Sequence, residues 1–524
     1  MSDARELRAG ALSALLESDG GLRYVRWGGV EILRRVYAAA RDPQWGTHLP
    51  AAGAVEVRTE AASFSVRFRG RTRAGDIDLS WETTIRGEAS GSLSWRVEGK
   101  AEREFLTNRT GMCVLHPAAL AGRPCVVVRD DGTAVSGSFP ESIAPHQPFR
   151  RIRAIRWEPA PGVSAEARVE GDVFEMEDQR NWTDDSYKIY STPLEEPIPR
   201  VFPEGARIRH ELALRLDGVP PAGDPSEEVR VEVDRAAAGP LPAVGLPAGF
   251  PRDARIRPAH LRVELGSAEA PRFRDAVREA RACGAALEIA VSPAEDVEFD
   301  RIAALAREAG LEGTRVLVGA SWEELLRTAR GRLGGLRLGA GSTSFYAALN
   351  RRPPRADLVD EVFFPAHPQV HAEDARTILE NVEGLRAAVA DARRKFPGRA
   401  VSVTPLAFAP RGRTDPREAG PLGASWAIGS LRALREGGAA RVTVESRVPQ
   451  VLDALAEAGA FEGASALPAR TSAPERVGAW AVRGSGGARL LVFNRTGDAV
   501  TVREAASGRA VRLEPWGWAR VDLE

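Results

Sequence analysis

Apolar and polar residues alternate with a period of two from Gly20 to Val233, and almost no helical stretch interrupts them. Runs of this kind include Ser65–Phe68, Ile77–Trp81 and Leu93–Val97. A period of two is the pattern of half-buried antiparallel strands, whose side chains point alternately to the two faces of a sheet. A long series of such strands predicts a large antiparallel β-sandwich, which we place in residues 1–235.

The pattern changes in the middle of the chain, where short apolar runs alternate with stretches rich in Ala, Arg and Glu. Two of these stretches, Phe273–Gly284 and Ile302–Gly310, have the apolar spacing of surface helices. Eight strand-and-helix units predict a TIM-like (β/α)8 barrel in residues 240–470, with an open α/β sheet as the alternative. The candidate strands are Ala243–Leu246, His260–Leu265, Ala286–Val291, Arg315–Gly319, Leu336–Gly339, Glu361–Phe364, Val401–Pro405 and Arg441–Glu445.

Alternation returns in the last part of the chain, in runs such as Ala479–Val482 and Arg489–Phe493. It predicts a small C-terminal β-domain in residues 471–524. The full length of 524 residues agrees with three parts, since domains hold roughly 150 residues each. We therefore expect a multidomain chain in which the α/β barrel comes between two β-domains.

The charge and the cysteines of the chain exclude several functions. Lys and Arg together number 72, and so do Asp and Glu, so neither nucleic acid nor a membrane is an expected partner. Three cysteines without a Cys-x-x-Cys pair indicate a reducing compartment. Since Met1–Gly20 contains no long apolar run, we expect a cytoplasmic protein. The sequence does not indicate an oligomeric state.

The most polar part of the chain is the segment Phe174–Tyr190. If the strand pattern continues into it, Phe174 and Met176 point into the core. Glu175 and Glu177 then project together from the opposite face, about 7 Å apart. Two carboxylates this close can have divergent pKa values, as an acid/base pair requires.

The same segment continues with groups that a solvated strand does not need. A Glu-x-Glu pair alone is more often a solvated face, but the following Asn-Trp-Thr-Asp-Asp is typical of a turn, and sites commonly lie on such loops. Lysine occurs three times in a chain that otherwise uses arginine, and Lys188 offers a compact ammonium for an oxyanion. Lys188, Glu175 and Glu177 are therefore catalytic candidates. The candidate substrate-binding residues here are Asp178, Arg180, Asn181 and Asp184.

Two other segments carry candidate site residues. In Phe105–Pro117 we expect Cys113 and Leu115 to point inward and His116 to end the strand. A strand-end histidine is more often a structural hydrogen-bonding group, but a hydrolytic site needs a proton shuttle, so His116 is a catalytic candidate near Lys188. Arg109 in the same segment, and Trp45 in a polar and aromatic loop of the kind that lines sugar sites, are candidate substrate-binding residues.

A metal ion is an alternative for this site. His116, Glu175, Asp178 and Asp184 are hard ligands for a divalent ion if they converge. However, the sequence contains neither His-x-His nor His-Glu-x-x-His spacing. We therefore expect no metal and no cofactor.

These segments carry a resemblance to a known family. The chain resembles the D-apionate lactonase family in the segments Asn108–Pro117 and Phe174–Asp184. It also shares the motifs Gly-Gly-x-Glu and Arg-Asp-x-x-Trp, which lie within residues 28–45. The similarity is strongest over residues 20–215 and looser in the barrel, at Leu349–Arg351 and His367–Asp374. The resemblance implies a carboxylic-ester hydrolase that opens a small sugar-acid lactone, D-apionolactone, to D-apionate in apiose catabolism.

Other functions stay open from the residues alone. Lactone hydrolysis needs a base for water and a donor for the oxyanion, and the candidates above supply both. A glycoside hydrolase would need two carboxylates about 5–10 Å apart at the carboxyl ends of barrel strands. Glu445 ends one candidate strand, but Asn350 is followed by Arg351 rather than by a glutamate. A mutarotase-like activity and non-catalytic carbohydrate binding fit the sandwich without better explaining Arg180–Lys188.

Overall fold

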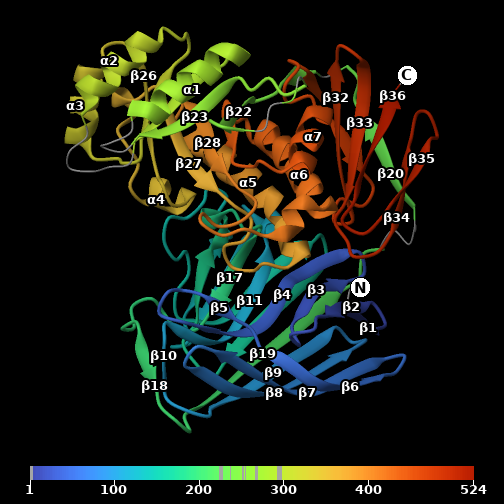
Figure 1. Ribbon diagram of the computed structural model, residues 1–524. Coiled ribbons are helices and arrows are strands. Elements are labelled where there is room, and N and C mark those ends of the chain that lie inside the picture. Colours follow the sequence, from blue (N-terminus) through green and yellow to red (C-terminus); the bar gives the residue numbers. More distant parts are fainter. Residues whose placement is uncertain are drawn as a thin grey trace. The chain divides into compact units, whose positions relative to one another are not determined.

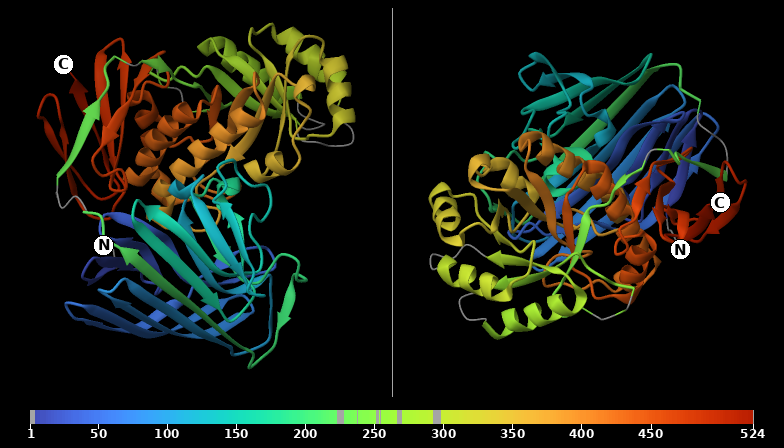
Figure 2. Two further views of the ribbon diagram at one scale, coloured as in Figure 1. Left: turned by 180° about the vertical axis from the view of Figure 1, so that it is seen from behind. Right: turned by 90° about the horizontal axis from the view of Figure 1, so that it is seen from above.

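The computed structural model describes residues 4–222, 228–236, 238–250, 253, 255–265, 270–291 and 298–523 (Figures 1 and 2). The chain divides into two compact units. The first holds Met1–Gln179 and Ser186–Pro225, and the second holds Arg180–Asp185 and Ser226–Glu524. None of the described helices combines the length and the apolar character that a membrane span requires.

The first unit is built from two large antiparallel sheets (Figure 1). The first sheet has the order β1 (Arg5–Ala9), β2 (Leu12–Leu16), β3 (Leu22–Trp27), β4 (Val30–Arg41), β11 (Arg109–Pro117), β17 (Ser186–Tyr190) and β16 (Glu175–Asp178), with β5 (Thr47–His48) beside β4. The second has the order β13 (Ala134–Ser138), β12 (Pro124–Arg129), β14 (Ile152–Ala160), β15 (Val163–Glu170), β19 (Arg207–Gly218), β9 (Ser92–Ala101), β8 (Ile77–Glu88), β7 (Ser63–Ala74) and β6 (Ala51–Thr59). Smaller elements are β10 (Phe105–Thr107), which pairs with β18 (Arg200–Phe202), and the 3-10 turns η1 (Ala118–Leu120) and η2 (Gln179–Trp182).

Alternate residues of both sheets form one apolar core, which confirms the predicted sandwich. Trp81 and Trp95 enter the core from the second sheet, Val114 and Met176 enter it from the first, and Phe174 enters it directly before β16. The alternation leaves the odd-numbered residues of β16 on the opposite face of the first sheet. Glu175 and Glu177 therefore project from that face, as predicted.

The second unit contains a closed barrel of eight parallel strands, so the predicted barrel is confirmed and the open sheet is excluded. The strands are β22 (Ala243–Pro247), β23 (His260–Leu265), β24 (Ala286–Val291), β25 (Arg315–Val318), β26 (Arg337–Gly341), β27 (Glu361–Ala366), β28 (Ala400–Leu406) and β29 (Arg441–Val444). The helices are α1 (Ala270–Cys283), α2 (Phe299–Ala309), α3 (Glu323–Leu333), α4 (Tyr346–Arg351), α5 (Ala375–Lys395), α6 (Pro421–Gly437) and α7 (Pro449–Glu457), with 3-10 turns η3 (Ala356–Leu358) and η4 (Pro416–Ala419). β22 pairs with β29 as well as with β23, which closes the barrel.

The small C-terminal β-domain takes strands from both sides of the barrel in sequence. One sheet has the order β21 (Gly239–Pro240), β30 (Ser465–Leu467), β32 (Val477–Gly484), β33 (Gly487–Asn494) and β36 (Trp518–Leu523). The other has the order β31 (Ala469–Thr471), β20 (Glu228–Val233), β34 (Val500–Glu504) and β35 (Ala510–Leu513). Strand β20, which the sequence analysis placed in the sandwich, therefore belongs with the tail, because it pairs in parallel with β34.

Candidate active site

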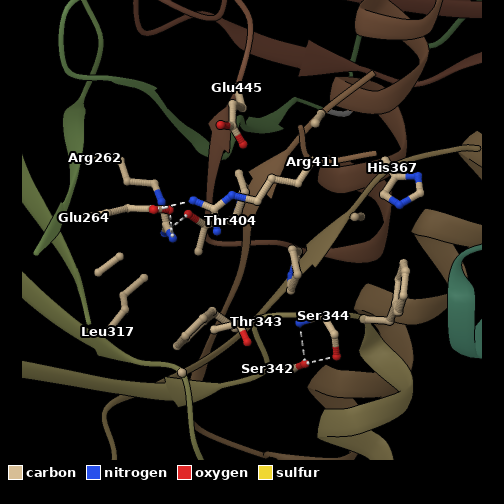
Figure 3. Close-up of a pocket in the computed structure, with 18 of the residues that line it drawn as sticks. Arg262, Glu264, Leu317, Ser342, Thr343, Ser344, His367, Thr404, Arg411 and Glu445 are labelled. Atoms are coloured by element: carbon tan, nitrogen blue, oxygen red, sulfur yellow. Dashed lines mark hydrogen bonds and ion pairs between the residues drawn. The ribbon is translucent and has the colours of Figure 1, made fainter. Parts of the chain in front are cut away.

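The second unit contains a cavity of about 270 Å³ at the carboxyl end of the barrel strands (Figure 3). Its lining comes from strand ends and from the residues that follow them. Glu264 lies near the end of β23 and Thr404 near the end of β28, whereas His367 and Glu445 directly follow β27 and β29. In (β/α)8 enzymes this face of the barrel carries the active site, because the loops there are free to vary while the strands hold them in place.

Two carboxylates of the cavity differ in their electrostatic surroundings. Glu264 forms ion pairs with Arg411 and with Arg262, whose Nη2 lies 3.3 Å from its Oε1. Partial burial alone would raise the pKa of Glu264, but the charges of Arg262 and Arg411 outweigh it, so that this pKa is lowered. The pKa of Glu445 is raised, first because the surrounding protein desolvates it, and further by the charge of Glu264 against the opposing Arg411.

The opposed pKa shifts assign different roles to the two carboxylates. Glu264 stays ionised and fixes the positions of its two arginines. Glu445, with a raised pKa and an accessible side chain, is the better base for a water molecule, because proton transfer is most effective when the pKa of the base approaches the working pH. Figure 3 shows the Arg411 side chain between Glu264 and Glu445. The pair is therefore suited to acid/base chemistry.

His367 supplies a neutral ring at the same cavity. Burial lowers its pKa to about 4, so the imidazole is uncharged at neutral pH. The backbone N–H of Gln369 donates to Nδ1 of His367 over 3.3 Å, so we assign the ring proton to Nε2. A neutral imidazole with a proton on Nε2 is a hydrogen-bond donor. It can polarise a carbonyl group without carrying a charge of its own.

The remaining wall of the cavity combines hydroxyl groups with aromatic rings. Ser342, Thr343 and Ser344 follow β26, and the Oγ atoms of Ser342 and Ser344 lie 3.1 Å apart. Phe345 and Phe363 also line the cavity. A few hydroxyl groups on an apolar wall are typical of sites that bind small polar ligands.

A polar layer inside the barrel lies below the cavity and holds Arg262. Glu288 is fully buried and accepts a hydrogen bond from Nη1 of Arg262 over 2.8 Å. The same Nη1 also donates to Oγ1 of Thr404 over 2.8 Å. Burial would raise the pKa of Glu288, but Arg315, His260 and Arg262 together lower it well below its usual range. Glu288 is thus a permanent carboxylate that positions Arg262 at the floor of the cavity.

The segment Arg180–Asp185, in which three substrate-binding residues were predicted, packs against the helices of the second unit. Oδ2 of Asp184 lies 2.6 Å from Nδ1 of His371, and Oδ1 accepts a hydrogen bond from Asn381. Nδ2 of Asn350 donates to Oδ1 of Asn181 over 2.9 Å. Among the described residues that line the barrel cavity, none belongs to this segment. Asn181 and Asp184 therefore anchor the segment, and a substrate-binding role for them and for Arg180 stays a prediction.

The catalytic candidates of the first unit come together on one face of its first sheet. β16 and β17 pair so that Glu177 lies opposite Lys188 and Glu175 lies opposite Tyr190. Nζ of Lys188 is 2.7 Å from Oε2 of Glu177, and both side chains are buried. Burial lowers the pKa of Lys188 while the charge of Glu177 opposes this shift. Glu175 accepts hydrogen bonds from the Tyr190 hydroxyl and from the backbone N–H of Leu194. A catalytic role for these residues stays a prediction.

His116 lies beside the Glu175–Lys188 segment, as expected, but its side chain is on the other face of this sheet from Lys188, and a catalytic role for it stays a prediction. It pairs with Tyr187, one position away from Lys188, and successive side chains of a strand point to opposite faces. Its ring packs against Phe139 and Trp157 in the core, and burial lowers its pKa to about 3. The inward residues of β11 are correspondingly Met112 and Val114, not Cys113 and Leu115.

The other predicted residues of the first unit have mixed positions. Asp178 lies on the core-facing side, where it accepts a hydrogen bond from the backbone N–H of Ala144 over 3.1 Å. Arg109 and Trp45 lie together, with the guanidinium carbon 5.0 Å from the centre of the indole ring. Within the described ranges, no three His, Cys, Asp or Glu side chains are grouped as a metal site would require.

Most of the cavity residues were not found from the sequence. Glu445 was noted as the end of a barrel strand, and His367 was noted in the barrel part of the family resemblance. The predicted barrel strands could have indicated the others, because residues at the carboxyl end of each strand are the ones that face the site. The residues missed are Arg262, Glu264, Ser342, Thr343, Ser344, Thr404 and Arg411.

Family models match all three parts of the chain. They describe the N-terminal domain of D-apionate lactonase over residues 1–219, its TIM barrel domain over residues 250–451, and its C-terminal immunoglobulin-like domain over residues 474–521. A curated relative, D-apionate lactonase from Brucella anthropi, is 33% identical over 421 residues, which covers 72% of this chain and 68% of the relative.

The chain also has distant likenesses among solved structures. CelM2, a bifunctional glucanase-xylanase from a metagenome library, aligns over 56% of this chain and 97% of its own, with a TM-score of 0.40 and 12% identity. A GH30 endoxylanase from Clostridium papyrosolvens aligns over the same shares, with a TM-score of 0.38 and 12% identity. Likenesses this weak carry no information about function.

Proposed function

The chain belongs to the D-apionate lactonase family, and on that basis we propose that it hydrolyses the ester bond of a sugar-acid lactone, with D-apionolactone as substrate and D-apionate as product. The structural observation that carries the proposal is the pair of carboxylates with opposed pKa shifts, Glu264 and Glu445, in the cavity at the barrel mouth. The volume of about 270 Å³ lies near the roughly 300 Å³ lower end for small-molecule sites and suits a single sugar ring.

The proposed reaction adds one water molecule across the ring ester. Glu445 takes a proton from water while the water oxygen forms a bond to the carbonyl carbon. The negative charge that develops on the carbonyl oxygen is stabilised by the Nε2–H of His367 and by the nearby guanidinium of Arg262. The ring C–O bond then breaks, and Glu445 returns its proton to the departing ring oxygen. The new carboxylic acid ionises and releases a proton to solvent.

The hydroxyl-bearing wall supports a polyhydroxy substrate. Ser342, Thr343 and Ser344 can exchange hydrogen bonds with substrate hydroxyls, whereas Phe345 and Phe363 pack against the apolar side of a sugar ring. Sugar lactones are activated esters, so that a single base with one or two oxyanion donors is a sufficient catalytic apparatus.

Glycoside hydrolysis is a second candidate, because Glu264 and Glu445 are two carboxylates at the carboxyl ends of barrel strands, as that chemistry requires. Assays with the substrate of each reaction distinguish the two functions. We expect the purified protein to release acid from D-apionolactone in a pH-stat, above the spontaneous rate, and to release no nitrophenol from aryl glycosides. Nitrophenol release without acid release from the lactone would decide for the glycosidase.

A further inference from the structure

One buried arginine in the first unit has donors with no acceptor. Arg109 begins β11, and 8% of its surface is exposed. Its Nε and Nη2 atoms have no hydrogen-bond partner, and no carboxylate among the described residues lies within ion-pair distance of it. Buried polar groups are nearly always satisfied, and a buried guanidinium without an acceptor is costly. An acceptor that is not part of the described chain would satisfy it.

Two aromatic rings hold the Arg109 guanidinium in place. Its central carbon lies 4.0 Å from the ring centre of Tyr190 and 5.0 Å from that of Trp45. Stacking on aromatic faces uses the flat sides of the guanidinium and leaves its edge, with Nε and Nη2, available for an anion. The Tyr190 hydroxyl is fixed in turn by Glu175.

Hydrogen bonds hold the loop that carries Trp45 in a defined conformation. Oδ1 of Asp42 accepts hydrogen bonds from the backbone N–H groups of Gln44 and Gly46, and Nη1 of Arg41 donates to the Trp45 carbonyl over 3.1 Å. Trp45 itself has a φ of 68°, a left-handed conformation that is unusual for a bulky side chain. Non-glycine residues held in this way cluster at ligand sites. The indole ring remains 40% exposed, so a ligand can reach it.

The charges around Arg109 also favour an anion. The strand register places Arg41 directly opposite Arg109. The positive charge of Arg41 also contributes to lowering the pKa of Lys188. The carboxylates of the same face are Glu177, which pairs with Lys188, and Glu175, which is held by Tyr190 and Leu194. Arg109 thus lies beside another cation, and both of these carboxylates already have partners.

We infer that Arg109, Trp45 and Tyr190 form a binding site for the carboxylate of a sugar acid. The carboxylate accepts from Nε and Nη2 of Arg109 as a two-point pair, for which the planar guanidinium is suited. The carbon chain of the acid packs on the exposed indole face of Trp45. The choice of a sugar acid rests on the proposed function, whose product belongs to this class. Inorganic phosphate offers the same kind of anionic oxygen acceptors and is the competing ligand.

The test is calorimetric titration of the full chain, which needs no turnover. We expect sodium D-apionate to bind the wild type, and Arg109→Lys to weaken this binding at least tenfold although it keeps the positive charge. Trp45→Ala, which removes a part-exposed side chain and so preserves folding, is expected to weaken binding several-fold. A melting temperature near that of the wild type verifies folding of each variant.

Three outcomes overturn the inference. They are absence of D-apionate binding, binding that is unchanged in both Arg109→Lys and Trp45→Ala, and phosphate binding as tight as that of D-apionate. Failure of the proposed function is distinguishable from these. A chain that binds D-apionate through Arg109 but hydrolyses no lactone would support this site while refuting the lactonase.

Discussion

At the scale of single residues, the raised pKa of Glu445 has a direct consequence for the pH dependence of catalysis. Only the carboxylate form accepts a proton from water, so with Glu445 as the proposed base we expect kcat/KM to fall as the pH drops through the pKa of Glu445. Because this pKa is raised, the fall begins above the ordinary glutamate value of about 4.3. Glu264→Gln removes a negative charge that raises the pKa of Glu445, so we expect the acidic limb of the kcat/KM profile to move to lower pH.

The matched control for this profile is Glu324→Gln, which removes an exposed carboxylate from α3. Its acidic limb should coincide with that of the wild type. An acidic limb that stays in place in Glu264→Gln, or moves to higher pH, would contradict the coupling between the two cavity carboxylates.

The buried pair of Lys188 and Glu177 leads to a prediction about stability. Removing one partner of a buried ion pair leaves the other charge without compensation. We therefore expect Lys188→Met to lower the free energy of unfolding by about 3 kcal/mol. Lys188→Met with Glu177→Gln should recover most of this loss, because neither charge then remains. Denaturant unfolding gives the free energy of unfolding of each variant. Equal stability of the single and the double variant would refute a stabilising ion pair between Lys188 and Glu177.

The same double variant separates the structural role of Lys188 from a catalytic one. A stable double variant with wild-type lactone hydrolysis would show that Lys188 supports the fold alone. A stable double variant without activity would support a catalytic role for the pair, and Glu177→Gln alone would then show whether the loss belongs to Lys188.

At the scale of elements, the polar segment Arg180–Asp185 can approach α5 closely because Gly384 of this helix has no side chain. A Cβ at position 384 would lie 2.2 Å from the carbonyl oxygen of Thr183, which belongs to the backbone and cannot rotate away. We expect Gly384→Ala to destabilise the protein by about 1–3 kcal/mol through overpacking. Gly331→Ala is the control, because a Cβ there meets no atom within 4 Å on α3, and it should stabilise by up to about 1 kcal/mol.

Both glycine variants are compared in one thermal unfolding series. A melting temperature of Gly384→Ala at or above that of the wild type would mean that the segment does not pack as described.

The elements also show which features were predictable from the sequence. The barrel strands were found because each is a short apolar run between amphipathic stretches, a pattern that local sequence records. The domain of β20 was missed because Val229 and Val231 alternate as any half-buried strand does, and alternation does not say which sheet a strand joins. The face of β11 on which His116 lies was mispredicted for a related reason. A one-residue error in the direction of β11 moves every side chain to the other face.

The cavity was harder to predict than the fold. Glu264, Arg262 and Arg411 come from two different segments, and their proximity depends on barrel closure rather than on any local pattern. The polar segment Phe174–Tyr190 drew attention because its polar residues are consecutive. Several of those residues pair with one another or with residues of the second unit such as His371 and Asn381. A high density of polar residues therefore indicated burial and hydrogen bonding more directly than catalysis.

At the scale of the whole molecule, Glu383 joins the barrel to the C-terminal β-domain within the second unit. It accepts hydrogen bonds from Arg432 of α6 and from Arg495, which follows β33. Burial would raise the pKa of Glu383, but these arginines lower it well below its usual range. A depressed pKa in the folded state adds stability above the unfolded value of about 4.3, and this stability is lost as the pH falls towards the folded value.

We therefore expect Glu383→Gln to lower the free energy of unfolding at neutral pH by about 3 kcal/mol, because two buried guanidinium groups lose their shared partner. The difference between variant and wild type should shrink as the pH falls below about 4, because the carboxylate of the unfolded wild type then takes up a proton while that of the folded protein stays ionised. Urea unfolding at several pH values gives both quantities. A difference that does not depend on pH would contradict the assigned pKa shift.

The proposed role of Glu445 as the base at the barrel mouth is tested most directly by kcat for D-apionolactone hydrolysis by Glu445→Gln in a pH-stat. The substitution keeps the size of the side chain and removes its ability to accept a proton. Loss of a general base lowers the rate by about 10²- to 10⁴-fold, so we predict a fall of that size, with Glu324→Gln unaffected. A kcat of Glu445→Gln close to that of the wild type would show that Glu445 is not the base.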